Sequence, residues 1–260
     1  MSTGTCWLAS RAPTRPLAGS SSLPPELKNL LNQFGGAFWQ FDATEIAHMF
    51  SPTYSPSSTL VDVAYSLLKQ DSSAWPKGPE DATFHKPLVD SLNDFLKASH
   101  LALDLSDPPI ISMGERWYSG LRFMPFVDGT CSTHDRDRGP VKREAVGGVF
   151  FREGEETELA IPIKLDEDWP TVVAQAARSA QILLATCPSR KFGVVIGFRR
   201  TTLELRFLIS HRGGLTGSKP LSVVEEKGKR DILRVFLCML MWRTKEDAGM
   251  LVYDTGADGA

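Results

Sequence analysis

Residues 159–223 read LAIPIKLDEDWPTVVAQAARSAQILLATCPSRKFGVVIGFRRTTLELRFLISHRGGLTGSKPLSV, and this stretch decides the fold. In residues 159–166 the apolar Ile161, Ile163 and Leu165 alternate with other residue types, which predicts a strand with one buried face. Side chains two residues apart in a strand share a face. We therefore expect Lys164 and Asp166 to project together from the other face.

A helix and two further strands follow this first strand. Proline favours the first turn of a helix because it lacks an N–H donor, and Pro170 follows Asp168 and Trp169. Apolar residues then recur at helical spacing from Val172 to Leu184. Residues 191–198 and 202–210 have strand character and are joined by a short turn at 199–201. This order predicts a mixed sheet with a helix packed on it.

The same region contains an ordered series of short motifs that resembles a known family. After a run from 161 to 175, the motifs are PSRKF (188–192), LRF (205–207), HRGGL (211–215) and SKPL (218–221). The series resembles the segment that precedes the catalytic core in fungal-type protein kinases of mushroom-forming fungi, and it covers roughly the last 110 residues. That segment is itself similar to the restriction-endonuclease-like nuclease core, which implies an α/β fold of that topology.

The resemblance implies a nuclease-like site whose chemistry is altered. In the nuclease core this strand usually reads Glu-x-Lys, the next helix carries a glutamine, and an upstream strand supplies Pro-Asp. Here the strand reads Lys164-Leu165-Asp166, with reversed charges, and a lysine at a ligand position repels the cation that such a nuclease needs. We expect no catalytic residue, cofactor or metal. The degenerate site positions are Phe126, Asp128, Lys164, Asp166 and Gln175, of which Gln175 lies off the apolar stripe and is expected to face solvent.

Basic residues gather between 187 and 221, where seven of them accompany a single acid, Glu204, in a chain of net charge −2. On one shared face they would attract phosphates or an acidic protein surface. Strand alternation in 203–210 instead favours positions scattered over two faces. The candidate polyanion-binding residues are Arg190, Lys191, Arg199, Arg200, Arg206, Arg212 and Lys219.

The chain as a whole divides into four predicted parts. Residues 1–24 are rich in Ser, Pro, Ala and Thr and are expected to be a disordered tail. Residues 25–109 are expected to form a helical subdomain, with apolar spacing over 27–41, a helix after Ser57-Ser58-Thr59 and a helix starting at Pro87. Residues 110–243 are expected to form the α/β module, with strands in 117–126 and 145–152 and a closing helix at 231–242. Residues 244–260 are expected to be a C-terminal tail.

Composition limits the class of protein. Hydrophobic residues make up 42% and charged residues 23%, which is ordinary for a globular protein. No apolar run reaches the ~18 residues of a membrane-spanning helix. The four cysteines are isolated and form no zinc-binding pairs, which is typical of reduced thiols. We therefore expect an intracellular protein, cytoplasmic or nuclear, without membrane association.

Protein-kinase chemistry is not encoded in the sequence. The run His211-Arg212-Gly213 lacks the aspartate of a catalytic loop, and the glycine-rich phosphate loop, the strand lysine and Asp-Phe-Gly are also missing. Residues 213–219 read GGLTGSK, in which Gly-Ser-Lys replaces the Gly-Lys-Ser or Gly-Lys-Thr of a nucleotide-binding loop. A tight turn between sheet elements is expected there.

The leading hypothesis is a non-catalytic regulatory or partner-docking module of a fungal-type protein kinase domain-containing protein. Its partner would be another protein or a kinase domain, with weak binding of nucleic acid as a secondary expectation. The alternative is a nucleic-acid-binding protein or metal-dependent nuclease that uses a migrated acidic set, Asp128, Asp166 and Glu167. A third reading is a truncated or decayed gene product. Three acids in metal-ligand reach would favour the nuclease, whereas a lysine among them would exclude it.

Overall fold

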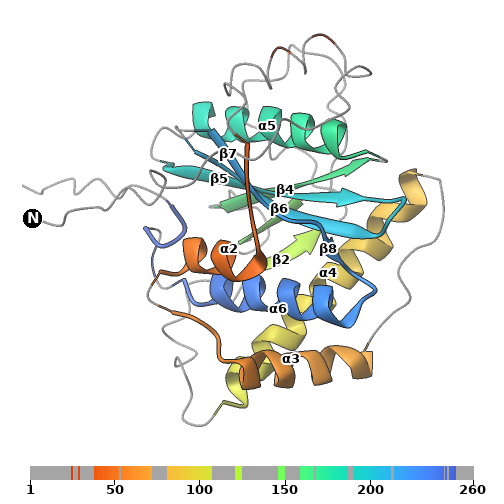
Figure 1. Cartoon of the computed structure of the whole chain (residues 1–260), viewed down its shortest axis with the longest axis vertical. Helices are drawn as coiled ribbons and strands as arrows, with labels where there is room; N and C mark the ends of the chain where they lie inside the picture. Colours follow the sequence, from red (N-terminus) through yellow and green to blue (C-terminus); the bar gives the residue numbers. More distant parts are fainter. Residues whose placement is uncertain are drawn as a thin grey trace, which may run out of the picture.

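The segment 159–223 forms the centre of a mixed β-sheet in the computed structural model of the chain (Figure 1). The structure describes residues 25, 29, 38–52, 54–71, 81–106, 121–124, 146–149, 159–166, 168–186, 190–211, 214–242, 244 and 246–249. Within these residues the sheet has eight strands. They are β1 (Phe38–Phe41), β2 (Leu121–Met124), β3 (Val146–Val149), β4 (Leu159–Asp166), β5 (Phe192–Arg199), β6 (Glu204–His211), β7 (Gly214–Ser218) and β8 (Leu221–Ser222).

Strand order in the sheet is β1-β7-β6-β5-β4-β3-β2, with β8 paired to β6. β2, β3 and β4 are antiparallel neighbours. β5 runs parallel to β4, which requires a crossover connection between them. β5, β6 and β7 are again antiparallel, and β1 lies parallel to β7. The mixed α/β class that the sequence predicts is confirmed.

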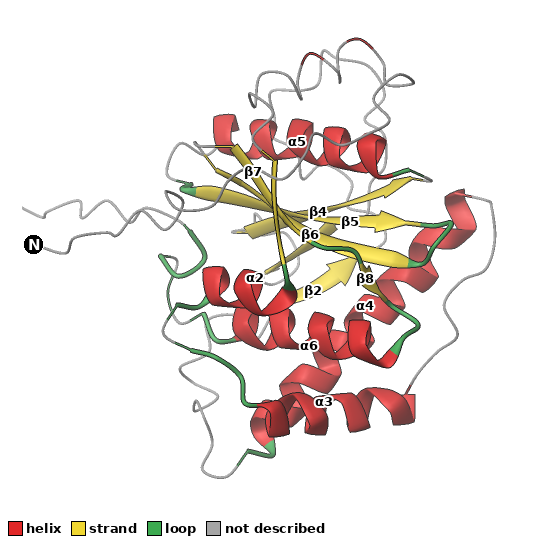
Figure 2. Ribbon diagram, in the orientation of Figure 1, coloured by secondary structure: helices red, strands yellow, loops and turns green. Residues whose placement is uncertain are grey.

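Helices cover both faces of this sheet. The described helices are α2 (Ala43–Phe50), α3 (Ser58–Asp71), α4 (Asp81–Asp104), α5 (Trp169–Thr186) and α6 (Glu226–Leu240). The crossover helix α5 lies on one face, and α2 and α6 lie on the other (Figure 2). α4 packs against β2 and α6, while α3 packs against α4 and α6. In the described part of the chain, no helix has the length and apolar character to cross a membrane.

Strand alternation separates two hydrophobic cores. Val194, Ile196 and Phe198 of β5 face the larger core, which also contains residues of α2, α3, α4 and α6. Val195 faces a smaller core that lies beneath α5 and includes Val172. The helices between residues 43 and 104 therefore pack on the same core as the sheet.

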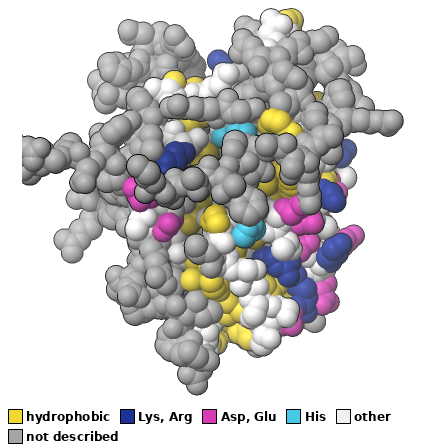
Figure 3. Space-filling view, turned by 60° about the vertical axis from the view of Figure 1, so that its left-hand side comes forward, with side chains coloured by type: hydrophobic (Ala, Val, Ile, Leu, Met, Phe, Trp, Pro, Cys, Tyr) yellow, Lys and Arg dark blue, Asp and Glu magenta, His cyan; other side chains and the backbone are white. Residues whose placement is uncertain are grey.

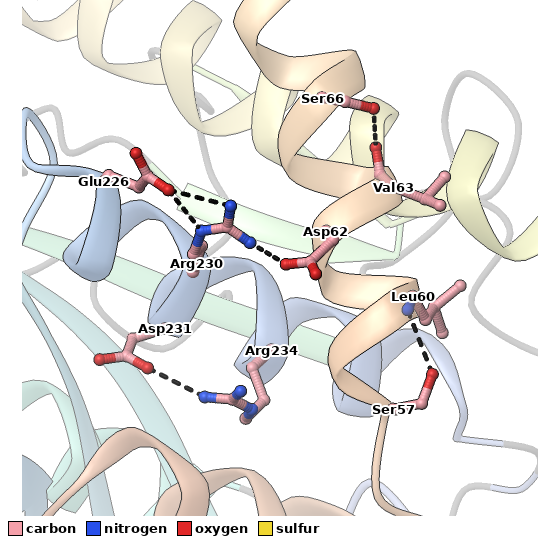
Figure 4. A network of polar contacts seen from close by, with 9 residues as sticks. All are labelled: Ser57, Leu60, Asp62, Val63, Ser66, Glu226, Arg230, Asp231 and Arg234. Atoms are coloured by element: carbon pink, nitrogen blue, oxygen red, sulfur yellow. Dashed lines mark hydrogen bonds and ion pairs between the residues drawn. The ribbon is translucent and has the colours of Figure 1, made fainter.

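One ion pair joins α3 to α6, and a second lies within α6 (Figure 4). Arg230 on α6 pairs with Glu226 at 2.9 Å and with Asp62 on α3. Its guanidinium also lies 4.5 Å from the centre of the Tyr65 ring. These groups are partly exposed, and such pairs contribute at most about 1 kcal/mol each. Burial of apolar side chains such as Val61 therefore dominates this interface.

Several predicted elements are confirmed, although they begin or end at other residues than expected. The helix after Ser57 is α3, and the Ser57 hydroxyl caps it by accepting from the N–H of Leu60 at 3.1 Å. The strands expected in 117–126 and 145–152 are β2 and β3, which are shorter than those ranges. The closing helix is α6, which begins earlier than expected, at Glu226.

Residues 38–41 are a correction, because they form strand β1 and not part of a helical stretch. Phe38 pairs with Leu215 of β7 in parallel register. Four residues fit helix and strand spacing about equally, and the strand that pairs with them lies far along the chain. The helix starts only afterwards, where Asp42 and Glu45 form a capping box with hydrogen bonds of 2.9 and 3.1 Å.

Two further local expectations are wrong. α4 begins at Asp81 and contains Pro87 in its interior. Proline there removes one backbone hydrogen bond, and the complete burial of neighbours such as Leu88 offsets that loss. Residues 213–219, expected as a tight turn, include strand β7. Gly217 serves close packing there, because a Cβ atom would lie 2.8 Å from Cδ2 of Leu208.

Candidate functional site

Lys164 and Asp166 share one face at the end of β4, as the sequence predicts, and α5 covers this face. Gln175 of α5 donates a hydrogen bond from Nε2 to Oδ2 of Asp166 at 3.3 Å, which places this carboxylate beside the helix. Lys164 shares that face by strand alternation and is only 6% exposed. Gln175 was expected to face solvent, which is wrong: it is half-buried, since it contacts Asp166 across the gap between helix and strand.

A capped and closely packed helix start fixes the position of α5 over these residues. Asp168 accepts from the N–H of Thr171 at 2.9 Å and from its hydroxyl at 2.8 Å, which satisfies donors of the first turn. Gly197 of β5 lies directly below that turn, because a Cβ atom there would meet Cγ1 of Val172 at 2.6 Å. Trp169, the first residue of α5, is 6% exposed and lies against the same glycine.

Gly197 also defines a row of residues across three strands. In the strand register it pairs with Lys164 of β4 on one side and with Arg206 of β6 on the other. Adjacent strands lie ~4.8 Å apart, so the Cα atoms of Lys164 and Arg206 are roughly 10 Å apart. Two basic side chains therefore flank the glycine beneath the start of α5.

Arg206 is the most unusual side chain of this row. It is 5% exposed, and its guanidinium lies 4.3 Å from the centre of the Trp169 ring in a cation–π contact. Its Nε and Nη1 atoms are buried and have no hydrogen-bond partner among the residues that the structure describes. Burial lowers the pKa of Arg206 to about 10; the charge of Glu204 opposes this shift and that of Arg199 adds to it. Arg206 is therefore a buried cation with hydrogen-bonding capacity to spare at neutral pH.

A second row lies one step closer to the strand ends. It consists of Asp166, Arg199 and Glu204, which are paired in register across β4, β5 and β6. Oε2 of Glu204 accepts from the hydroxyl of Thr202 at 2.6 Å and from the indole N–H of Trp169 at 3.4 Å. Both carboxylates of this row thus have hydrogen-bond donors. We call Lys164, Asp166, Gln175, Arg199, Glu204 and Arg206 the β4–β6 charged site.

The described acidic side chains of this site do not converge as the ligands of a metal ion would. Among the described residues, no group of three His, Cys, Asp or Glu side chains could hold a metal. Asp166 and Glu204 stand on strands separated by β5, and Arg199 lies between them in the register. Phe126, Asp128 and Glu167, which the sequence analysis considered as upstream or migrated positions, lie outside the described residues.

The seven candidate polyanion-binding residues do not form one surface as far as the structure describes them. Arg199, Arg200 and Arg206 lie at one end of the β5–β6 hairpin, whereas Arg190 and Lys191 lie at the other, roughly 25 Å away at ~3.3 Å per residue. Exposed Lys219 follows β7, and Arg212 lies outside the described residues. On the face shown in Figure 3, the described basic and acidic side chains are interspersed.

Sequence reasoning missed the roles of Trp169 and Glu204 and the burial of Arg206. The signal for Arg206 was present, because it alternates with Leu205 and Phe207 in an apolar strand and so must lie on the face opposite to theirs. The contact between Arg206 and Trp169 had no local signal, since it joins residues from two elements distant in the sequence.

Known proteins give no guide to this site. We find no match to the chain among protein-family models, curated proteins or solved structures.

Proposed function

We propose that this chain is a non-catalytic regulatory or partner-docking module, related to the segment that precedes the catalytic core of fungal-type protein kinases. In this proposal the β4–β6 charged site corresponds to the active site of a restriction-endonuclease-like core whose metal chemistry has been replaced by binding.

The order of elements supports this relationship. α4 is followed by the antiparallel strands β2, β3 and β4, then by the crossover helix α5 and by β5, which is parallel to β4. This order is compatible with the endonuclease-like topology that the sequence resemblance implies. The contact of Gln175 with Asp166 also agrees with that resemblance, in which the helix glutamine accompanies the charged pair of the strand.

The burial of Lys164 carries the functional part of the proposal. A nuclease of this kind needs carboxylates that converge on a hard divalent cation. Lys164 stands at the position of the first carboxylate, and at 6% exposure it cannot turn its charge fully into solvent. The buried ammonium group of Lys164, two residues from Asp166, carries a positive charge. It therefore repels Mg²⁺ or Mn²⁺, which the carboxylate of Asp166 alone would attract.

Metal binding and DNA cleavage test the proposal directly. We expect neither Mg²⁺ nor Mn²⁺ to raise the melting temperature, whereas a metal at 100 times its dissociation constant would add about 2.7 kcal/mol of stability. We also expect no cleavage of single- or double-stranded DNA. Cleavage by the unmodified chain that is abolished by Asp166→Asn would contradict the proposal.

A charge-restoring variant provides the positive arm. Lys164→Glu with Asp166→Lys and Phe126→Asp recreates the ligand set of the nuclease pattern, and we expect this triple variant to gain metal-dependent stability. The matched control is Lys164→Gln with Asp166→Asn and Phe126→Asn, which changes the same positions without adding carboxylates. A metal response in both triple variants would show that the response does not arise from the restored ligands.

A further inference from the structure

We propose that the β4–β6 charged site binds a phosphate group, either free or as a phosphate monoester on a larger molecule, with Arg206 as its principal ligand. This inference rests on the proposed non-catalytic function, because a site that held divalent metal would have a different charge balance.

The unmade hydrogen bonds of Arg206 are the first argument. A buried charged group normally has hydrogen-bond partners, because leaving its donors unsatisfied costs a large desolvation penalty. Trp169 covers one face of the guanidinium but cannot accept the N–H groups that lie in the guanidinium plane. Two buried nitrogens of Arg206, Nε and Nη1, are therefore left for an acceptor from outside the described chain.

The second argument is the group of cations around Arg206. Arg199 is near enough to Arg206 to disfavour its protonated form, although the charge of Glu204 has the larger and opposite effect. Lys164 adds a third cation, in the same row as Arg206 and on the other side of Gly197. An anion that bound among these groups would be attracted by all three cations.

The number of available donors selects the class of anion. At this end of β4–β6 the described ionisable side chains are four basic and three acidic, and Asp168 keeps its charge while it caps α5. The four basic residues are Lys164, Arg199, Arg200 and Arg206, and the three acidic residues are Asp166, Asp168 and Glu204. A phosphate monoester carries about −1.5 to −2 charges and three strong acceptor oxygens. Its oxygens can accept from Nε and Nη1 of Arg206 and from a neighbouring cation at the same time, whereas a carboxylate has only two oxygens.

Phosphate titration of three proteins tests the assignment. Wild type, Arg206→Met and Arg190→Met are titrated with inorganic phosphate by calorimetry, in EDTA and at constant ionic strength. Arg190 is the matched control because it is also a buried arginine, at 7% exposure, whose Nε has no hydrogen-bond partner in the described part of the chain, and it lies just before β5, far from Arg206. We expect Arg206→Met to weaken binding at least tenfold and Arg190→Met to change it less than twofold.

Four ligands distinguish the sources of the phosphate group. Inorganic phosphate and phenyl phosphate represent the free ion and the monoester, whereas dimethyl phosphate and acetate represent a nucleic-acid diester and a carboxylate. Saturable binding of either of the first two supports the proposal and identifies its source. Equal or tighter binding of dimethyl phosphate or acetate overturns the assignment to phosphate, as does the absence of any response to the first two.

A second variant guards against misfolding. If Arg206→Met does not fold, Arg199→Gln removes the neighbouring half-buried charge, and unchanged phosphate affinity in that variant overturns the site.

The outcomes also distinguish a failure of the phosphate site from a failure of the proposed non-catalytic function. Failure to bind phosphate, with no response to Mg²⁺, removes only the phosphate site. Binding of Mg²⁺ with DNA cleavage by wild type removes the non-catalytic function whatever phosphate does.

Discussion

Replacement of Gly197 by alanine tests the close packing that places α5 over the charged site. The added Cβ atom would lie 2.6 Å from Cγ1 of Val172, 3.2 Å from Cδ1 of Leu208 and 3.4 Å from Cζ3 of Trp169. Favourable carbon–carbon contacts lie at about 3.5–4.0 Å. Val172 is completely buried and is β-branched in a helix, where one side-chain rotamer is strongly preferred, so it cannot turn away cheaply.

The two opposing contributions can be estimated. Overpacking of a buried site costs about 1–3 kcal/mol, while removing glycine from a strand interior returns about 0.5–1 kcal/mol. We therefore expect Gly197→Ala to lower the free energy of unfolding by roughly 1–2 kcal/mol. At about 2–4 °C per kcal/mol for a chain of this size, the melting temperature should fall by several degrees.

Gly193→Ala is the matched control, because it changes the same residue type on the same strand and face. The atoms nearest to a Cβ atom at Gly193 belong to Ala180, at 3.7 Å or more, which is an ordinary contact. We expect this variant to be neutral or more stable by up to about 1 kcal/mol in urea unfolding. Val172→Ala should partly rescue Gly197→Ala, with a coupling of at least about 0.5 kcal/mol in a double-mutant cycle. Equal effects of the two glycine variants, or additivity in the cycle, would refute this account of how α5 is positioned.

Three further predictions concern other parts of the fold. Gly228→Ala should destabilise the protein by about 3 kcal/mol or more in urea unfolding, although alanine usually stabilises helices, because the Cβ atom would lie 2.0 Å from the backbone oxygen of Ser222. Burial lowers the pKa of His211 below its usual value, so its contribution to stability is present above about pH 6.5 and is lost as the pH falls. His211→Gln should therefore lose less stability than wild type between pH 7.5 and 5.5, and an equal or larger loss would contradict the burial effect. Burial raises the pKa of Cys238 to about 12, so mass spectrometry should find its thiol unmodified by iodoacetamide at pH 8 until denaturant is added.

The part of the fold that the sequence predicts correctly is the part with strong local periodicity. The alternation in 159–166 and the helical stripe after Pro170 identify β4 and α5, and the alternation also places Lys164 and Asp166 on one face of β4. These inferences succeed because side-chain direction in a strand or helix depends only on spacing along the chain.

The missed elements depend on partners distant in the sequence. β1 becomes a strand because it completes the sheet edge beside β7, and β7 itself contains glycines that read locally as a turn. Gly217 shows why composition misled: the glycine avoids a clash with Leu208 and Phe38 and does not bend the chain. The environment of Arg206 was out of reach for the same reason, since Trp169 and Gly197 come from other elements.

The stability and phosphate affinity of Arg206→Met distinguish a functional binding site from one that has lost its function. Replacing a buried ionic group by an apolar side chain of similar volume is often neutral or stabilising, because the desolvation penalty disappears. Methionine at position 206 can keep the contact with Trp169, and it leaves no unmade hydrogen bonds. If the unliganded Arg206→Met protein is as stable as wild type but no longer binds phosphate, the guanidinium serves binding at the expense of stability. If the variant loses stability and wild type shows no affinity for phosphate, the guanidinium serves the fold through its contact with Trp169. That result would favour the third hypothesis, a truncated or decayed gene product without separate activity.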